Sequence, residues 1–211
     1  MQPNAYPVQF SVEYPARPLN RLTTFFRLIL AIPIFIVFGL VDGGTWQWSY
    51  NHTTTVVVAA GAGGVLFFAP LLMILFRQKY PRWWFDWNLE LQRFSNRVGI
   101  YVALMDDRYP STDEHQSVRL DYVYPDATRD LNRWLPLVKW FLAIPHYVVL
   151  FFLGIGAFVV VIIAWFAILF TGSYPRGLFD YVEGVLRWQN RVTGYAFTLV
   201  TDTYPPFRLA P

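Results

Sequence analysis

Four apolar runs with almost no charge constrain the fold of this 211-residue chain more than any other feature. They cover Leu22–Val41, Thr55–Phe76, Trp134–Leu153 and Ala157–Phe170. About 20 residues of α-helix cross a hydrocarbon core of roughly 30 Å. We therefore expect an α-helical integral membrane protein with four transmembrane helices in two hairpins. The last two runs and the turn between them, Trp134–Phe170, share only 37 residues, so a short or partly re-entrant second hairpin is an alternative.

The composition agrees with a membrane protein. Hydrophobic residues make up 55% of the chain and charged residues only 15%, whereas a soluble domain carries about 25% charged residues. The chain has no cysteine, which excludes disulfides and thiolate metal sites. Its first residues lack the pattern of a cleavable signal peptide, so we expect the first apolar run to act as its own insertion signal.

A repeated stretch opens the first and third runs. Asn20–Pro33 reads NRLTTFFRLILAIP, and Asn132–Pro145 reads NRWLPLVKWFLAIP. Because proline removes a backbone donor, we expect each helix to kink there. The single cation of each copy, Arg27 or Lys139, can extend back to the lipid headgroups and anchor the topology. An alternative is that the two cations bind lipid phosphate between helices.

Two further segments predict amphipathic helices. In Trp83–Arg97, tryptophan, leucine and phenylalanine recur on one face and charged residues on the other. A second such helix follows Tyr174-Pro175 and extends to Arg191. Both fit the membrane interface, although an ordinary amphipathic helix on a small soluble domain has the same pattern. Arg97 and Arg191 either hold lipid headgroups or belong to helix caps and sheet contacts.

Short segments with strand-like patterns flank these helices. Alternation of apolar and polar residues is typical of a half-buried strand, and Tyr-Pro ends the first and third of the segments, since proline cannot donate to a strand ladder. We predict a small antiparallel sheet in the cytoplasm. Its strands are Val8–Glu13, Gly99–Met105, Ser117–Val123 and Gly194–Thr201.

The order strand, span, span, amphipathic helix, strand occurs twice, which predicts an internal duplication with repeats at 1–110 and 111–211. The loop at 42–54 and the turn at 153–156 contain no lysine or arginine. Cytoplasmic loops carry an excess of these residues. We therefore expect a multi-pass protein of the bacterial inner (plasma) membrane with both termini in the cytoplasm.

These tandem units resemble a bacterial membrane family known as domain of unknown function 4389, present in two copies. The resemblance covers nearly the whole chain. It rests on Trp134–Phe152 and on the helices that contain Arg93–Arg97 and Arg187–Arg191. It implies membrane location and no agreed activity. The first half departs from the pattern by having Ile34 where the second has His146.

The chain shows little that would support catalysis. Its three histidines have no metal-binding spacing, and no nucleophile elbow, phosphate loop or dinucleotide fingerprint is present. His146 lies inside a predicted span, so it either bonds to backbone freed by Pro145 or serves as a proton relay or ligand. Asp106 and Asp107 are explained by turn chemistry. We predict no catalytic, cofactor-binding or metal residue, and no enzyme.

We therefore expect a non-catalytic integral membrane accessory or scaffold protein that oligomerises or docks a partner. The alternative is a subunit of an oligomeric channel or transporter. Small residues four apart, Ala59 with Gly63 and Ala60 with Gly64, favour close helix packing within the chain or between subunits. The expected partners are the lipid bilayer and a homo-oligomer or larger membrane complex. Nucleic acid is not expected, because membrane topology explains the basic residues, which are interleaved with acidic ones.

Overall fold

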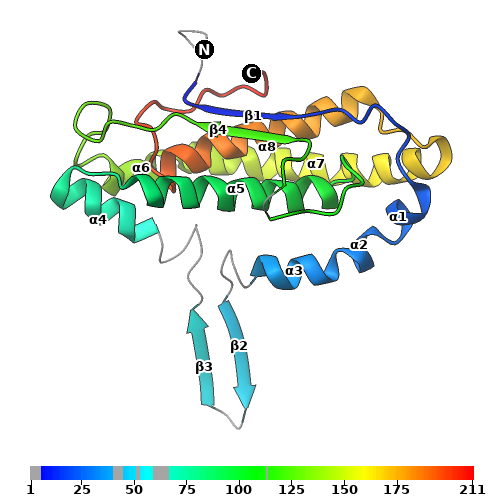
Figure 1. Cartoon of the computed structure of the whole chain (residues 1–211), viewed down its shortest axis with the longest axis horizontal. Coiled ribbons are helices and arrows are strands. Elements are labelled where there is room, and N and C mark those ends of the chain that lie inside the picture. Colours follow the sequence, from blue (N-terminus) through cyan, green and yellow to red (C-terminus); the bar gives the residue numbers. More distant parts are fainter. Residues whose placement is uncertain (1–5, 40–44, 51–52, 59–66, 113) are drawn as a thin grey trace.

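Two long amphipathic helices and a pair of strands form the centre of the molecule (Figure 1). The computed structural model describes residues 6–39, 45–50, 53–58, 67–112 and 114–211. Helices α5 (Arg82–Val102) and α8 (Arg176–Ala196) run along the long axis beneath strands β1 (Val8–Val12) and β4 (Val118–Tyr122). Both amphipathic helices and both of these strands were predicted and are confirmed.

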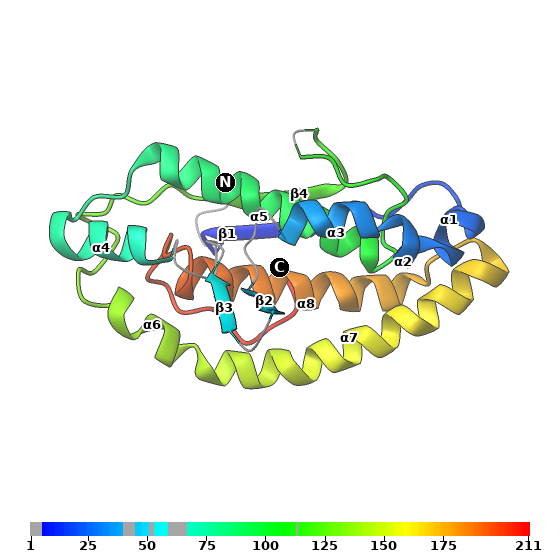
Figure 2. The ribbon, with the colours of Figure 1, turned by 90° about the horizontal axis from the view of Figure 1, so that it is seen from below.

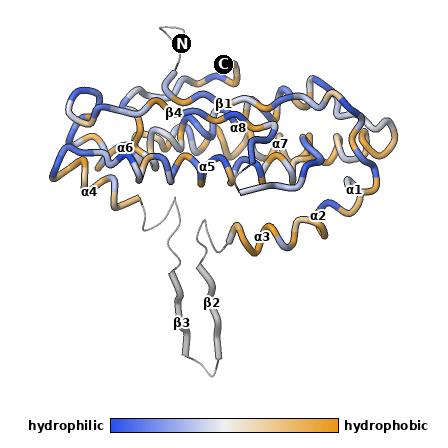
Figure 3. The backbone as a smooth tube through the Cα atoms, in the orientation of Figure 1, coloured by the Kyte–Doolittle hydropathy of each residue, from blue (hydrophilic) through white to orange (hydrophobic). Residues whose placement is uncertain are grey.

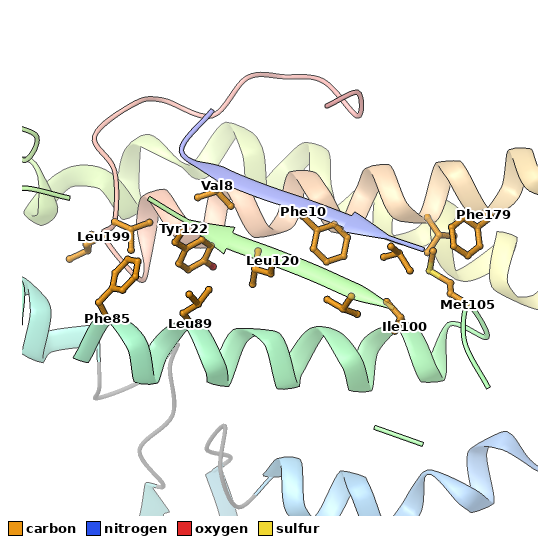
Figure 4. Close-up of a cluster of buried hydrophobic side chains, with 14 of the residues drawn as sticks. Val8, Phe10, Phe85, Leu89, Ile100, Met105, Leu120, Tyr122, Phe179 and Leu199 are labelled. Carbon is orange, nitrogen blue, oxygen red and sulfur yellow. The ribbon is translucent and has the colours of Figure 1, made fainter. Parts of the chain in front are cut away.

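The strand pair is antiparallel and amphipathic. Val8 lies opposite Tyr122 and Val12 opposite Val118, and alternate residues of both strands are buried. Phe10, Leu120 and Tyr122 point from the strands toward α5 (Figure 4). Since side chains alternate across a strand, one face of the pair covers the hydrophobic core and the other faces outward.

Both long helices begin directly after a Tyr-Pro pair. Pro81 and Pro175 occupy the N-cap positions, where the missing N–H costs nothing. Each helix continues further than predicted. In α5, Phe94, Val98 and Tyr101 are buried with spacings of four and three residues, which is the helical period. The strands predicted at Gly99–Met105 and Gly194–Thr201 are therefore wrong, and the expected four-stranded sheet has two strands.

The prediction of four transmembrane helices in two hairpins is wrong. Among the described residues, α7 (Ile144–Thr171) alone forms a helix long and apolar enough to cross a membrane. The third and fourth predicted spans differ from the structure because α7 continues through Gly154 and Gly156, where we expected a turn. Isolated glycines lower helix propensity without breaking a helix. The multi-pass topology with cytoplasmic termini rested on the four spans and is not supported.

The first two predicted spans are also replaced by shorter elements. The first is divided into α1 (Arg21–Phe25), α2 (Arg27–Leu30) and α3 (Ile32–Phe38). The second begins within β3 (Thr53–Val58), whose β-branched residues favour a strand. Strand β2 (Thr45–Tyr50) pairs with β3, and helix α4 (Phe68–Arg77) follows. A short helix, α6 (Pro136–Leu142), precedes α7.

The predicted kinks at the two prolines are confirmed. Helix α2 ends at Leu30 and α6 at Leu142, and the next helix has Pro33 or Pro145 in its first turn. Proline cannot donate to the preceding turn and clashes with it. The small-residue pairs predicted at Ala59–Gly64, and parts of the predicted loop at 42–54, lie outside the described residues.

The apolar helices surround the central helices away from the strands. Seen from below, α7 curves along one edge of the molecule beside α8, and α3 lies near α5 (Figure 2). Two small clusters join them: Ala31 and Ile34 pack with Phe94 of α5, while Ala143 packs with Trp188 of α8. Each Leu-Ala-Ile-Pro stretch therefore contacts one of the two long amphipathic helices.

Candidate functional site

An extensive apolar surface covers α1–α3 and α7. The most apolar 18-residue window of α7 is only 6% buried. Among its side chains, Phe158 is 67% exposed and Phe170 is 78% exposed, and on α2 Leu28 is 70% exposed. Much of α3 and α4 is hydrophobic on the backbone trace (Figure 3). Monomeric soluble proteins rarely expose contiguous apolar patches of this kind.

A buried ion pair joins the first apolar helices to the end of α5. Arg27 is 2% exposed, and its Nη2 donates to Asp107 Oδ1 at 2.5 Å. Its Nη1 donates to the backbone oxygen of Asp106 at 3.1 Å. The guanidinium lies 4.1 Å from the ring centroid of Tyr101. Asp107 also accepts from the backbone N–H of Asn20, so one carboxylate holds two points of the α1–α2 segment.

A second ion pair repeats this geometry at the end of α8. Lys139 is fully buried, and its Nζ lies 2.7 Å from Asp202 Oδ1 and donates to Thr201 O at 2.7 Å. The ammonium is 5.2 Å from the Tyr195 ring. Asp202 accepts from the backbone N–H of Asn132. Burial lowers the pKa of Lys139, and the attraction of Asp202 opposes this effect.

These contacts correct the role expected for Arg27 and Lys139. We predicted cations that extend to lipid headgroups, but both side chains point inward to carboxylates. A buried charge needs a partner, and Asp107 and Asp202 supply it. Sequence reasoning missed these partners because it assigned Asp107 to turn chemistry. The available signal was the repeated Asp-x-Tyr-Pro at 107–110 and 202–205.

His146 is buried within an aromatic cluster. Its Nδ1 accepts from Trp188 Nε1 at 3.0 Å, and Phe207 stacks on the imidazole with 4.0 Å between ring centroids. The ring centroid of Tyr204 lies 4.8 Å from that of His146. The Nε2 of His146 has no hydrogen-bond partner in the described part of the chain. The hydrogen bond expected from His146 to backbone freed by Pro145 is replaced by this contact with the indole of α8.

The side chains of Arg97 and Arg191 bind the chain segments that follow their helices. Arg97 Nη1 donates to the backbone oxygens of Ser111 and Thr112. Arg191 donates through Nη1 to Arg208 O at 3.2 Å and through Nη2 to Ala210 O at 3.0 Å. Neither contact is with a helix cap. Both arginines are 3% exposed.

The two long helices meet at a reciprocal amide pair. Asn96 Nδ2 donates to Asn190 Oδ1 at 2.8 Å, and Asn190 Nδ2 donates to Asn96 Oδ1 at 2.8 Å. Both side chains line a cavity of about 470 Å³, together with Ser95, Gln92 and Gln189. The Ser95 hydroxyl has no hydrogen-bond partner within the described ranges. The described residues that line this cavity are all uncharged.

These contacts hold separate elements of the chain together. The described residues contain no group of three or more histidine, cysteine, aspartate or glutamate side chains that could hold a metal ion. The five predicted site residues are not brought into one centre: Arg27 and Lys139 belong to different ion pairs, while His146, Arg97 and Arg191 each have their own partners.

Comparison with protein families gives one match. Residues 134–208 match the family described as Domain of unknown function (DUF4389). The DUF4389 segment contains Lys139, His146, Arg191 and Asp202. The predicted second copy in the first half is not found, so the tandem arrangement of this family is not supported. No curated protein and no solved structure matches the chain.

Proposed function

We propose that this chain is a non-catalytic membrane accessory or scaffold protein. Its apolar helices contact lipid, and α5, α8 and the strand pair form a platform on which a second copy or a larger membrane complex docks. The observation that carries the proposal is the exposure of α7, whose apolar window is 6% buried. A helix of this composition inside a soluble protein would be mostly buried.

The free energy of hydration supports this role for the apolar surface. Phe151 is 64% exposed, Phe158 67% and Phe170 78%. Transfer of one large apolar side chain from water to an apolar medium is worth about 1.5–3 kcal/mol when complete. Exposure of many such side chains to water is therefore costly, and lipid removes the cost. Trp83 and Trp134 are also exposed, and tryptophan suits the headgroup region.

The two ion pairs support a structural role. Asp107 lies just after α5 and holds Arg27, while Asp202 lies after α8 and holds Lys139. Each pair therefore fixes the start of an apolar segment to the end of a platform helix. Such fixed attachment is what a scaffold requires, and it needs no nucleophile, base or metal.

The matched contacts also support an internal duplication, which we include in the proposal. Arg27 with Asp107 and Tyr101 corresponds to Lys139 with Asp202 and Tyr195. The backbone N–H of Asn20 donates to Asp107 as that of Asn132 donates to Asp202. The ion pair Arg82–Asp86 corresponds to Arg176–Asp180. Arg93 donates to the backbone oxygen of Leu120 as Arg187 donates to that of Phe10. The proposed location is the bacterial inner membrane.

Flotation with lipid vesicles tests the membrane contact. The purified protein is reconstituted with phosphatidylcholine vesicles and centrifuged in 1 M salt, which shortens electrostatic screening to about 3 Å. We expect wild type to float with the vesicles. The variant F151K/F158K should lose much of this association, because charges replace two exposed rings of α7. H115K adds a charge at an exposed loop position and serves as the control.

Native mass spectrometry of the protein extracted from membranes tests the scaffold role. We expect species heavier than the single 24.6 kDa chain, either as a homo-oligomer or with a partner. A single chain alone under mild detergent would contradict the scaffold proposal. Wild type that stays in the aqueous fraction, or F151K/F158K that floats as well as wild type, would contradict the membrane contact.

A further inference from the structure

A basic cavity lies on the outer face of the strand pair. It has a volume of about 480 Å³. The N-terminal strand β1 and the C-terminal segment lie on the side of the molecule opposite to α3 (Figure 1). The cavity is lined by Tyr6, Val8, Gln9, Phe10, Ser11, Arg119, Asp121, Arg187, Arg191, Arg208 and Pro211.

The strand register explains which side chains reach this face. Gln9 lies opposite Asp121 and Ser11 opposite Arg119. All four are exposed, whereas their neighbours along each strand are buried in the core. Arg119 therefore stands on the outer face, beyond the core that Figure 4 shows.

Arg187 and Arg191 reach the cavity from α8. Arg187 donates to Phe10 O at 3.0 Å and to Leu209 O at 2.9 Å, and it forms an ion pair with Glu183. Arg191 is 3% exposed, and its Nε is buried without a hydrogen-bond partner in the described part of the chain. No carboxylate of the described residues forms an ion pair with Arg191, and a buried charge without a counterion is costly.

Two further arginines line the cavity without taking part in holding the chain. The side chains of Arg119 and Arg208 are exposed, and neither has an ion pair or side-chain hydrogen bond among the described residues. Burial lowers the pKa of Arg191, as do the nearby charges of Arg208 and Arg187. Four arginines thus line one cavity, and Asp121, the one acidic side chain among its described lining residues, pairs with Arg93.

We propose that this cavity binds a phosphate group, with Arg119 and Arg208 as its accessible ligands and Arg191 as the buried charge beneath it. Guanidinium groups match phosphate oxygens in geometry and charge. A bound anion would relieve the repulsion among the arginines, and the cavity lies within the range of small-ligand sites. Holding the C-terminal segment explains Arg187 and the Nη groups of Arg191, but it leaves Arg119 and Arg208 unused.

The phosphate group has two sources, a soluble phosphorylated molecule or the headgroup of an anionic lipid. Isothermal titration of the detergent-solubilised full chain with inorganic pyrophosphate tests the shared chemistry. This titration does not depend on the proposed membrane function. We expect saturable binding to wild type, weakened about ten- to hundredfold in R119Q and in R208Q, because each removes one charged hydrogen-bond donor.

R129Q is the matched control. Arg129 is an exposed arginine, with 86% side-chain exposure, and it does not line the cavity. The R129Q variant loses the same charge as R119Q and R208Q but outside the cavity. Its pyrophosphate affinity should therefore equal that of wild type. R119Q and R208Q change exposed side chains, and circular dichroism spectra equal to wild type would exclude misfolding as the cause of lost binding.

Vesicle flotation separates the two sources. If R208Q floats less than wild type with phosphatidylglycerol vesicles but equally with phosphatidylcholine vesicles, the ligand is a lipid headgroup. If both vesicle types retain R208Q like wild type while pyrophosphate affinity is lost, the ligand is soluble. Absence of both pyrophosphate binding and a phosphatidylglycerol effect would overturn the proposal. An equal loss in R129Q would also overturn it, since binding would then follow net charge alone.

Discussion

The buried pair of Lys139 and Asp202 allows a quantitative prediction. Lys139 is fully buried, Asp202 is 19% exposed, and the charged atoms are 2.7 Å apart. With an effective dielectric constant of about 20, their attraction is about 6 kcal/mol. Burial of each ion costs several kcal/mol, and burial lowers the pKa of Lys139 despite the attraction of Asp202. The pair as a whole therefore contributes little net stability.

Removal of the carboxylate alone should be severe. In D202N, Lys139 stays buried without its counterion, although the Thr201 carbonyl still accepts from its Nζ. We expect the free energy of unfolding to fall by about 3–5 kcal/mol, and Tm by about 6–20 °C for a chain of this size. The double variant K139M/D202L should be close to wild type, because it buries neither charge.

The same variant predicts a dependence on pH. Without Asp202, the pKa of Lys139 in folded D202N lies further below its value in the unfolded chain. Between these two pKa values the unfolded state binds more protons, so stability should rise with pH up to about 10. D202N should therefore recover part of its lost Tm at pH 9.

Thermal unfolding followed by circular dichroism in detergent measures these effects. D180N is the matched control, because Asp180 pairs with Arg176 on the surface with side-chain exposures of 53% and 65%. An exposed pair of this kind contributes at most about 0.5 kcal/mol within a helix. A loss below about 1 kcal/mol in D202N, or an equal loss in D180N, would refute the reasoning.

Two further predictions concern packing and alkaline pH. A Cβ at Gly194 would lie 2.5 Å from Val8 Cγ2, whereas one at Gly99 would meet no atom within 4 Å. In chemical denaturation, G194A should lose about 1–3 kcal/mol of stability and G99A should gain about 0.5–1 kcal/mol. Equal effects of the two substitutions would contradict this packing. Burial raises the pKa of Tyr80 and Tyr122, so the unfolded state loses protons first and stability should fall above about pH 10. Tyrosinate absorbance recorded with circular dichroism checks this, and ionisation of every tyrosine in a fully folded protein would count against it.

Local patterns were sufficient for several elements. The helical period of Trp83–Arg97 predicted α5, and the alternation in Val8–Glu13 predicted β1. The kinks at Pro33 and Pro145 follow from the chemistry of proline in any helix. These features depend on neighbours within a few residues, which the sequence displays directly.

Other elements depended on distant contacts. Gly154 and Gly156 are compatible with a turn or with a long helix, and α7 is continuous through both. The end of α5 looks strand-like in isolation, but Val98 and Tyr101 pack with Ala31 of the α2–α3 junction. That packing favours helix where local pattern alone does not decide.

Extensive apolar segments, two long amphipathic helices and one cation in each copy of the repeated stretch can be read from the sequence alone. The role of those cations depends on the fold. Arg27 meets Asp107, 80 residues later in the chain, and Lys139 meets Asp202. Burial excludes water from a charge and makes a specific counterion necessary, but no local pattern tells which carboxylate the fold will bring to it.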